Sequence, residues 1–217
     1  MEKKKLNHYD VAEVIDRFEI NKVFDCFTLK NWLAIGTTNK LKPSHSEVLE
    51  EARQQLSIKW DEWNEEELKM NFVSMVIFVS QLDVPKHINT YFERKLSGKV
   101  NEISISVTVD CMLASPTYSG RPKNPYFFLQ EFKRSLGDNH DPEGQMLAAM
   151  ILSQKLNEDN EPLYGSWIQG RFWYFTTLTN KDYCVSKPFD ATEPEDLLQI
   201  VYVLRKLKEL ILARVTP

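Results

Sequence analysis

The run Tyr126-Phe-Phe-Leu-Gln-Glu131-Phe-Lys133 carries two charges at the end of an otherwise apolar and aromatic stretch. In a β-strand successive side chains point to opposite faces, so Glu131 and Lys133 would share one face. Charged residues are rarely left in an apolar strand unless they are paired, bind a metal or serve a function. The upstream run Ile103-Ser-Ile-Ser-Val-Thr-Val-Asp110 alternates apolar and polar residues and ends in another acid. An aspartate on one strand and Glu-x-Lys on the next predict a metal-and-lysine site suited to cutting phosphodiesters.

The length and composition indicate one sizeable globular core. The chain has 217 residues, of which 42% are hydrophobic, enough for one core with an N-terminal extension. The net charge of -4 argues against a protein that binds nucleic acid over a generally basic surface. A local basic groove remains compatible with this value, because the charge of the whole chain says little about one cleft.

Three cysteines, Cys26, Cys111 and Cys184, are widely spaced and form no CxxC pair. This pattern favours reduced thiols and a cytoplasmic protein over a disulfide framework or a zinc site. No apolar run approaches the roughly 20 residues of a membrane span, so we expect no membrane partner. The first residues, 1–8, have a positive start without an apolar segment behind it, which is unlike a signal peptide.

A capping box, Asn64-x-x-Glu67, predicts the start of a strong helix. Its apolar positions fall on one helical face, and Glu65 lies at the N-terminal end of that face. Glu65 is therefore a candidate site residue. The alternative is a first-turn acid stabilised by the helix dipole alone. The apolar positions of the expected face are Leu68, Phe72, Met75, Val76 and Val79.

Three strands are predicted after this helix, over residues 88–99, 102–114 and 126–133. The third is apolar on both faces in its first part, as expected of a central strand. Residues 115–125 contain three prolines and a glycine and are interpreted as a loop. This loop holds Arg121 and Lys123, which are candidates for contact with nucleic acid. A solvated hairpin loop without substrate contact is the competing interpretation.

The last part of the chain predicts one more helix, a β-meander and a final helix. Gly137 to His140 indicates a turn, and Asp141-Pro142 is a good N-cap and first-turn pair for a helix to about Leu156. Gln145 lies on the small-residue face of that helix and needs a hydrogen-bond partner, for which the backbone is one candidate.

Aromatic residues of the meander indicate a sheet surface covered by helices, with a platform for bases as the alternative. The expected strands are 164–169, 171–178 and 183–187, and the aromatic residues are Trp167, Trp173, Tyr174 and Phe175.

The order of these elements, with Asp110, Glu131-x-Lys133 and Gln145, resembles the PD-(D/E)XK nuclease superfamily. That group includes many restriction endonucleases and the nuclease domain of type I restriction motor subunits, which this chain resembles most. In the family the first core helix often carries an acid, which Glu65 matches. The second strand ends with an aspartate, the third carries (D/E)-x-K, and the following helix often carries a glutamine.

The resemblance covers roughly residues 60–180 and departs from the family pattern at two positions. Val109 stands where many members have proline, and Ala149 stands where some branches have a tyrosine. The resemblance implies an α/β fold with a restriction-endonuclease-like core. In it, a central mixed sheet of four to five strands is flanked by helices in α-β-β-β-α-β order. Residues 1–60 would be a helical N-terminal extension packed on the core, and 61–217 the nuclease-like domain.

The resemblance also implies a function, namely metal-dependent hydrolysis of phosphodiester bonds, with DNA as the expected substrate. Asp110 and Glu131 would bind Mg²⁺ or Mn²⁺, with the backbone carbonyl of Phe132 as a further ligand and Glu65 serving a second ion. Lys133 would orient a water molecule or neutralise developing charge. Gln145 would position the lysine or a phosphate.

Two other function classes stay open from the sequence. One is a catalytically inactive nuclease-fold module that binds nucleic acid or a protein partner, in which Glu131 and Lys133 form only a salt bridge. The other is a regulatory or scaffold protein without a nucleic-acid role, which the acidic net charge suits. Many nucleases of this kind dimerise to cut both strands, so a homodimer is a further expectation.

Overall fold

The computed structural model describes residues 9–35, 40–134 and 141–215. The expected turn Gly137 to His140 and the N-terminal residues 1–8 lie outside these ranges. No helix in the described part of the chain is long and apolar enough to cross a membrane. All three cysteines are free thiols.

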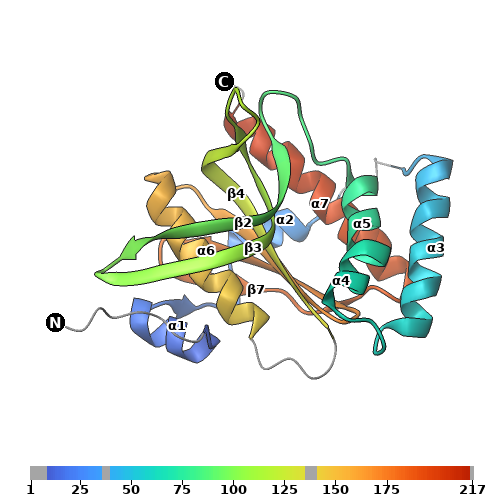
Figure 1. Ribbon diagram of the computed structural model, residues 1–217, viewed down its shortest axis with the longest axis horizontal. Coiled ribbons are helices and arrows are strands. Elements are labelled where there is room, and N and C mark those ends of the chain that lie inside the picture. Colours follow the sequence, from blue (N-terminus) through green and yellow to red (C-terminus); the bar gives the residue numbers. More distant parts are fainter. Residues whose placement is uncertain (1–8, 36–39, 135–140, 216–217) are drawn as a thin grey trace.

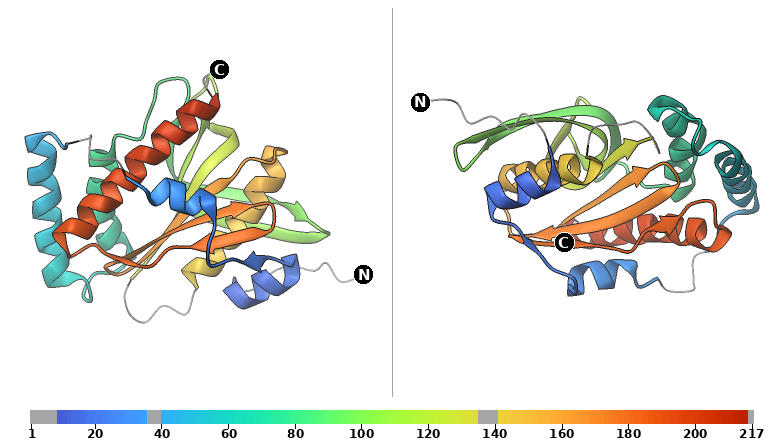
Figure 2. Two further views of the ribbon diagram at one scale, coloured as in Figure 1. Left: turned by 180° about the vertical axis from the view of Figure 1, so that it is seen from behind. Right: turned by 90° about the horizontal axis from the view of Figure 1, so that it is seen from below.

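A mixed β-sheet lies at the centre, with helices on both of its faces (Figures 1 and 2). Among the described residues the sheet has eight strands, in the order β1-β7-β6-β5-β4-β3-β2, and β8 pairs with β6. The chain forms α1 (Val11–Phe18), β1 (Asn21–Lys22), α2 (Phe27–Leu33), α3 (Pro43–Lys59), α4 (Glu65–Leu68), a π-helical turn (Lys69–Val73), α5 (Ser74–Ser80), β2 (Asn89–Val100), β3 (Ile103–Pro116), β4 (Pro122–Lys133), α6 (Pro142–Asn157), β5 (Leu163–Gln169), β6 (Phe172–Thr179), β7 (Asp182–Val185), β8 (Phe189–Asp190) and α7 (Pro194–Val215).

The α/β class and the expected order of elements are confirmed, but the expected size of the sheet is wrong. Strands β2, β3 and β4 are antiparallel neighbours, and β5 lies parallel to β4 after α6. Eight strands are present where four to five were expected. The additional strands β1 and β8 have only two residues each, too short to show any apolar alternation in the sequence. Strand β1 belongs to the N-terminal region, which is therefore not purely helical.

Two separate hydrophobic clusters form, and they explain why the central strands are apolar on both sides. One cluster joins the sheet to α2, α3, α5 and α7, and the other joins it to α1 and α6. Figure 2 shows α6 and α7 on opposite sides of the sheet. From Phe127 onward every residue of β4 is buried, as expected of a strand covered by helices on two faces.

The helix that begins at Asn64 has the predicted capping box, with both of its reciprocal hydrogen bonds present. Four residues of its predicted apolar face, Leu68, Phe72, Val76 and Val79, are buried as expected. The fifth, Met75, is 37% exposed, whereas Val73 and Ile77 are buried although they were not predicted. The π-helical turn over Lys69–Val73 changes the spacing of the buried positions at this point.

The expected loop over 115–125 is in fact a tight hairpin. Strand β3 continues to Pro116 and β4 already begins at Pro122, so only residues 117–121 connect them. Pro122 and Pro125 lie within β4, and the register shifts twice near Ala114. Such bulges accommodate residues that cannot take part in a regular ladder, which is why prolines here do not end the strand.

Candidate functional site

Asp110 and Glu131 are brought together by the pairing of β3 with β4. Cys111 is the register partner of Gln130, so the next residues in each direction, Asp110 and Glu131, fall opposite each other. The Phe132 backbone N–H donates a hydrogen bond of 2.7 Å to Oδ2 of Asp110. Along β3 the exposed polar positions end at Asp110, where the strand becomes buried on both faces. The structure therefore juxtaposes two acids at the entry to the core.

Both carboxyl groups are buried, and their pKa values are raised. Burial raises the pKa of Asp110 from 3.8 to about 6, although the Phe132 N–H and nearby Lys133 oppose the change. Burial also raises the pKa of Glu131 well above its ordinary value, and the neighbouring Asp110 carboxyl adds to this effect. Glu131 is only 1% exposed. Two acids enclosed in this way repel each other when both are ionised, so the pair favours a shared proton or a bound cation.

Lys133 lies beside these acids and forms an ion pair with Glu65 of α4. Its Nζ is 3.0 Å from Glu65 Oε2. Burial disfavours the charged lysine, but the hydrogen bond to Glu65 and the charges of Asp110 and Glu131 outweigh this, so the pKa of Lys133 is raised. Lys133 therefore stays protonated at neutral pH.

The donor set fits a hard divalent cation with few protein ligands. Oε1 of Glu131 is buried and has no hydrogen-bond partner, so one oxygen of a fully enclosed carboxylate is left for a ligand. Asp110 contributes a second carboxylate. The Phe132 side chain is in the core, so this residue can serve the site only through its backbone. In the described part of the chain, no three His, Cys, Asp or Glu side chains are grouped as a metal site. Two carboxylates and the Phe132 backbone carbonyl would be a suitable set of oxygen ligands for Mg²⁺, which usually keeps several of its water ligands.

Two residues that the sequence analysis missed, Glu93 and Lys69, lie at the edge of the same site. Phe92 pairs with Cys111 and Arg94 with Val109, so Glu93 falls opposite Asp110 on β2. Glu93 has a φ of 51°, a left-handed conformation that glutamate rarely adopts. Lys69 Nζ lies 2.5 Å from the Glu93 carboxylate and 3.1 Å from Glu66.

Irregular backbone conformations position both residues of the Lys69–Glu93 pair. Lys69 begins the π-helical turn, and π-turns inside helices often occur at functional sites. Residues held in sparsely populated backbone regions likewise cluster at such sites. Neither irregularity has a signal in the sequence, because Glu93 lies in a strand pattern and Lys69 in a helix pattern. The site therefore contains two Lys–Glu pairs beside the Asp110–Glu131 carboxyls.

An aromatic pair on β5 and β6 borders the carboxylates on the other side. Trp167 is the register partner of Glu131, and Tyr174 is the register partner of Trp167. Their rings stack with centroids 4.8 Å apart and an interplanar angle of 7°. Trp167 is only 4% exposed, which agrees with the prediction of a helix-covered sheet surface. This apolar wall excludes water from Glu131 and so contributes to its burial.

Gln145 lies in the first turn of α6, which packs on β4 and β5. A Cβ added at Gly165 would lie 3.0 Å from Met146 Sδ, so the glycine permits this close approach of helix and sheet. Gly165 and Trp167 are two residues apart and share a face, so α6 covers the face that carries Glu131. Oε1 of Gln145 is buried without a hydrogen-bond partner. No hydrogen bond joins it to Lys133 or Glu131 among the residues with described structure.

Arg121 and Lys123 are exposed and lie at the opposite end of β4 from the carboxylates. Lys123 is the register partner of Ser115, which lies five residues from Asp110 along β3, and this corresponds to about 17 Å. The structure thus brings together Glu65, Asp110, Glu131 and Lys133, and leaves the two predicted nucleic-acid contacts at a distance.

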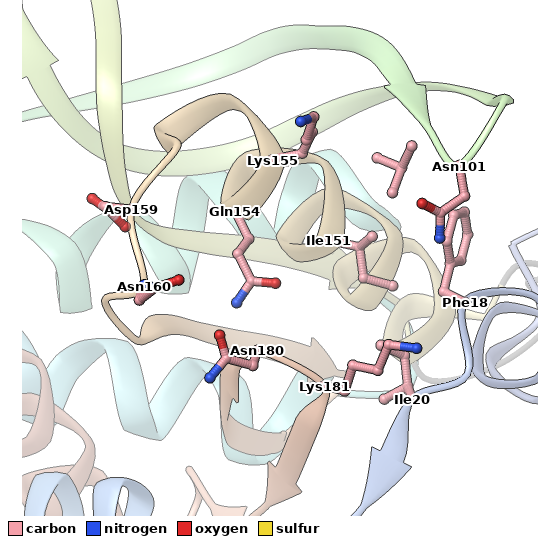
Figure 3. A pocket seen from close by; sticks show the side chains of 11 residues that line it. Phe18, Ile20, Asn101, Ile151, Gln154, Lys155, Asp159, Asn160, Asn180 and Lys181 are labelled. Carbon is pink, nitrogen blue, oxygen red and sulfur yellow. The ribbon is translucent and has the colours of Figure 1, made fainter.

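A pocket of about 260 Å³ at the C-terminal end of α6 contains none of these residues (Figure 3). Gln154 points across it toward Asn180 (Figure 3). When the Gln154 amide is oriented to satisfy both of its groups, it pairs with the backbone of Asn180 at 2.9 and 3.0 Å. These bonds tie α6 to the β6–β7 turn, which is a structural role.

Comparison with known proteins adds no family to this geometry. The chain matches no protein-family model and no curated protein.

Proposed function

We propose that this chain is a metal-dependent nuclease of the PD-(D/E)XK type, which hydrolyses phosphodiester bonds in DNA. The observation that carries the proposal is the buried Glu131 carboxyl, which has an oxygen without a partner, beside Asp110 and Lys133. An enclosed acid pair with raised pKa values is unfavourable for stability, and such arrangements are concentrated at catalytic and binding sites. A purely structural salt bridge would not need the second acid.

Each residue has a role in this proposal. Asp110, Glu131 and the Phe132 carbonyl would hold one Mg²⁺ or Mn²⁺, with the Phe132 N–H keeping Asp110 in place. When bound, such an ion would supply Lewis-acid stabilisation of phosphate charge and would activate water. Lys133, held by Glu65 and kept protonated, orients the attacking water and neutralises charge that develops on the phosphate.

The remaining two groups act beside this centre. Gln145 would accept a hydrogen bond from Lys133 or a water through its unpaired amide oxygen, or donate one to a phosphate from its amide nitrogen. Glu65 positions Lys133 through their ion pair, and its carboxylate would be the ligand available to a second ion. We also propose a cytoplasmic location, which the three free thiols support. Cutting both strands of a duplex would require two copies of the site, which is the basis for proposing a homodimer.

The test combines metal binding and cleavage on the same samples. Mg²⁺ and Mn²⁺ are titrated calorimetrically into the wild type and the Asp110→Asn/Glu131→Gln double variant, and each sample is assayed for plasmid nicking. We expect the double variant to lose both metal binding and nicking. The matched control is Glu62→Gln/Glu195→Gln, which removes two exposed acids elsewhere and should keep both properties. Metal binding that survives in the double variant would refute the assignment of the ligands.

A second candidate function is a catalytically inactive module of the same fold that binds nucleic acid or a protein partner. The observation that favours it is the engagement of Glu65 by Lys133, together with the absence of a three-residue metal cluster among described side chains. Under this alternative the wild type binds DNA in a salt-dependent manner without metal and cuts no duplex, single-stranded or branched substrate. Metal-dependent nicking by the wild type would exclude it.

A further inference from the structure

A cleft of about 820 Å³ lies between the β3–β4 hairpin and the turn that precedes β2. Figure 1 shows the chain between α5 and β2 passing close to the end of this hairpin. Lys86 and Asn89 line the cleft from the turn, and Thr117, Tyr118 and Lys123 line it from the hairpin. The cleft is thus formed by two segments about 30 residues apart in the chain, at the end of the sheet remote from the carboxylates.

The two segments that form this cleft are free of acidic residues, although the whole chain has a net charge of -4. Residues 84–92 and 111–130 contain no Asp or Glu, but they carry Lys86, Arg121 and Lys123. Asp83, just before the first segment, is occupied by the N–H and hydroxyl of Thr90 at 2.6 and 2.7 Å. Neither lysine has an ion-pair partner among the described residues, so both charges are available to an anion.

Tyr118 stands at the tip of the hairpin with its side chain fully exposed. The tip is well braced, because the Thr117 N–H donates to the Arg121 carbonyl and the Arg121 N–H donates back to Thr117 Oγ1, at 2.8 and 2.9 Å. A single exposed apolar residue needs no explanation by itself. An exposed ring that lines the same cleft as two unpaired cations, however, is the combination by which proteins hold an unpaired base and its phosphates.

We propose that this cleft binds a single-stranded segment of nucleic acid, with Lys86 and Lys123 against phosphates and Tyr118 stacked on a base. The inference rests on the proposed nuclease function and narrows its substrate class. Lys123 of the cleft pairs with Ser115, five residues along β3 from Asp110, so the cleft lies about 17 Å from the carboxylates. At the duplex rise of 3.4 Å, about five base pairs span this distance. The substrate would then carry an unpaired stretch within about five base pairs of the cut, as at an overhang or a branch.

The test measures binding without divalent metal, so it does not depend on cleavage. Fluorescence anisotropy with a labelled single strand of about 20 nucleotides, and with the matching duplex, is recorded in EDTA over a range of salt concentrations. The variants are Tyr118→Ala and Lys86→Ala/Lys123→Ala in the full chain. The control is Lys59→Ala/Lys187→Ala, which removes two exposed lysines away from the cleft.

We expect Tyr118→Ala to weaken single-strand binding at least about fivefold, because one stacking contact is lost, with little change for the duplex. The double lysine variant should weaken binding about tenfold and make the slope of log K against log salt shallower by about 1.4, as for two lost phosphate contacts. Affinities like those of the control would overturn the proposal. So would equal, variant-sensitive binding of labelled polyglutamate, which would assign the cleft to acidic peptides.

Failure of the cleft proposal and failure of the proposed nuclease function give different outcomes. If single-strand binding depends on the cleft but the protein never cuts, the nuclease activity is refuted and the cleft remains assigned to single-strand binding. Metal-dependent cutting that is unchanged by substitution of Tyr118, Lys86 and Lys123 would refute the proposed role of the cleft and leave the proposed nuclease activity standing.

Discussion

At one end of β4 the charged residues Arg121 and Lys123 are exposed to solvent, whereas at the other end Glu131 and Lys133 are at most 8% exposed. The exposed charges keep their hydration, so their presence alone says little about function. The buried charges lose their hydration, and repulsion between the two ionised acids Asp110 and Glu131 also opposes folding. The comparison teaches that charge kept where it is unfavourable is strong evidence for a site, while exposed charge needs a cleft beside it before it becomes informative.

The largest expected effect is on cleavage, at the buried end. Asp110→Asn, Glu131→Gln and Lys133→Ala should each lower the rate of plasmid nicking at least about 10²- to 10³-fold, because each removes a charge that acts on the transition state. Circular dichroism should show an intact fold in all three. Lys187→Ala, an exposed lysine outside the site, serves as the matched control. Nicking by Glu131→Gln at the wild-type rate would contradict the inference that the buried charges at this end of β4 mark the catalytic site.

The next effect concerns stability and its dependence on pH. Because burial raises the pKa of Asp110 from 3.8 to about 6, the folded protein holds a proton between these values that the unfolded chain releases. Stability therefore falls as pH rises through this window, by about 3 kcal/mol in total. Asp110→Asn removes this loss, so in metal-free buffer it should be more stable than wild type above pH 6, with the difference vanishing near pH 4.

Urea unfolding at several pH values measures this difference. Added Mg²⁺ should stabilise the wild type at neutral pH and leave Asp110→Asn almost unchanged, since a ligand stabilises only the state that binds it. A variant less stable than the wild type at every pH would show that Asp110 is a structural residue rather than a strained site residue.

A smaller effect is expected at Glu93, which lies opposite Asp110 and pairs with Lys69. Removing one negative charge near the carboxylates should weaken Mn²⁺ binding about threefold in Glu93→Gln, as the loss of a Coulomb attraction through solvent. The free energy of unfolding should change by less than about 1 kcal/mol, because the ion pair is partly exposed. Calorimetric titration measures the affinity, and an unchanged value would separate Glu93 from the site.

The smallest effect is expected at the exposed end. Tyr118→Ala and Lys123→Ala should each change the free energy of unfolding by no more than about 0.5 kcal/mol, since neither side chain is buried. Thermal unfolding of both variants beside Asp110→Asn compares the two ends of β4 directly. Substantial destabilisation by Tyr118→Ala would mean that the ring packs on the protein and is not held ready for a partner.

Local patterns were sufficient for much of the fold. The alternation before Asp110 predicted β3, the apolar run before Glu131 predicted the central strand, and Asn64 predicted the capped helix start. These features depend on backbone periodicity and on hydrogen bonds between residues close in the chain. For the same reason, the side-by-side placement of Asp110 and Glu131 followed from two neighbouring strands with a short connection.

Long-range packing decided the rest. The contact of Glu65 with Lys133 joins residues 68 apart in the chain, and the pairing of Lys69 with Glu93 needs both a π-helical turn and a left-handed residue in a strand. The tight β3–β4 hairpin moved Lys123 away from the carboxylates and into the wall of a cleft. Residue type and spacing specify which chemistry is available, but strand register and the burial supplied by distant helices determine which charges meet and what their pKa values become.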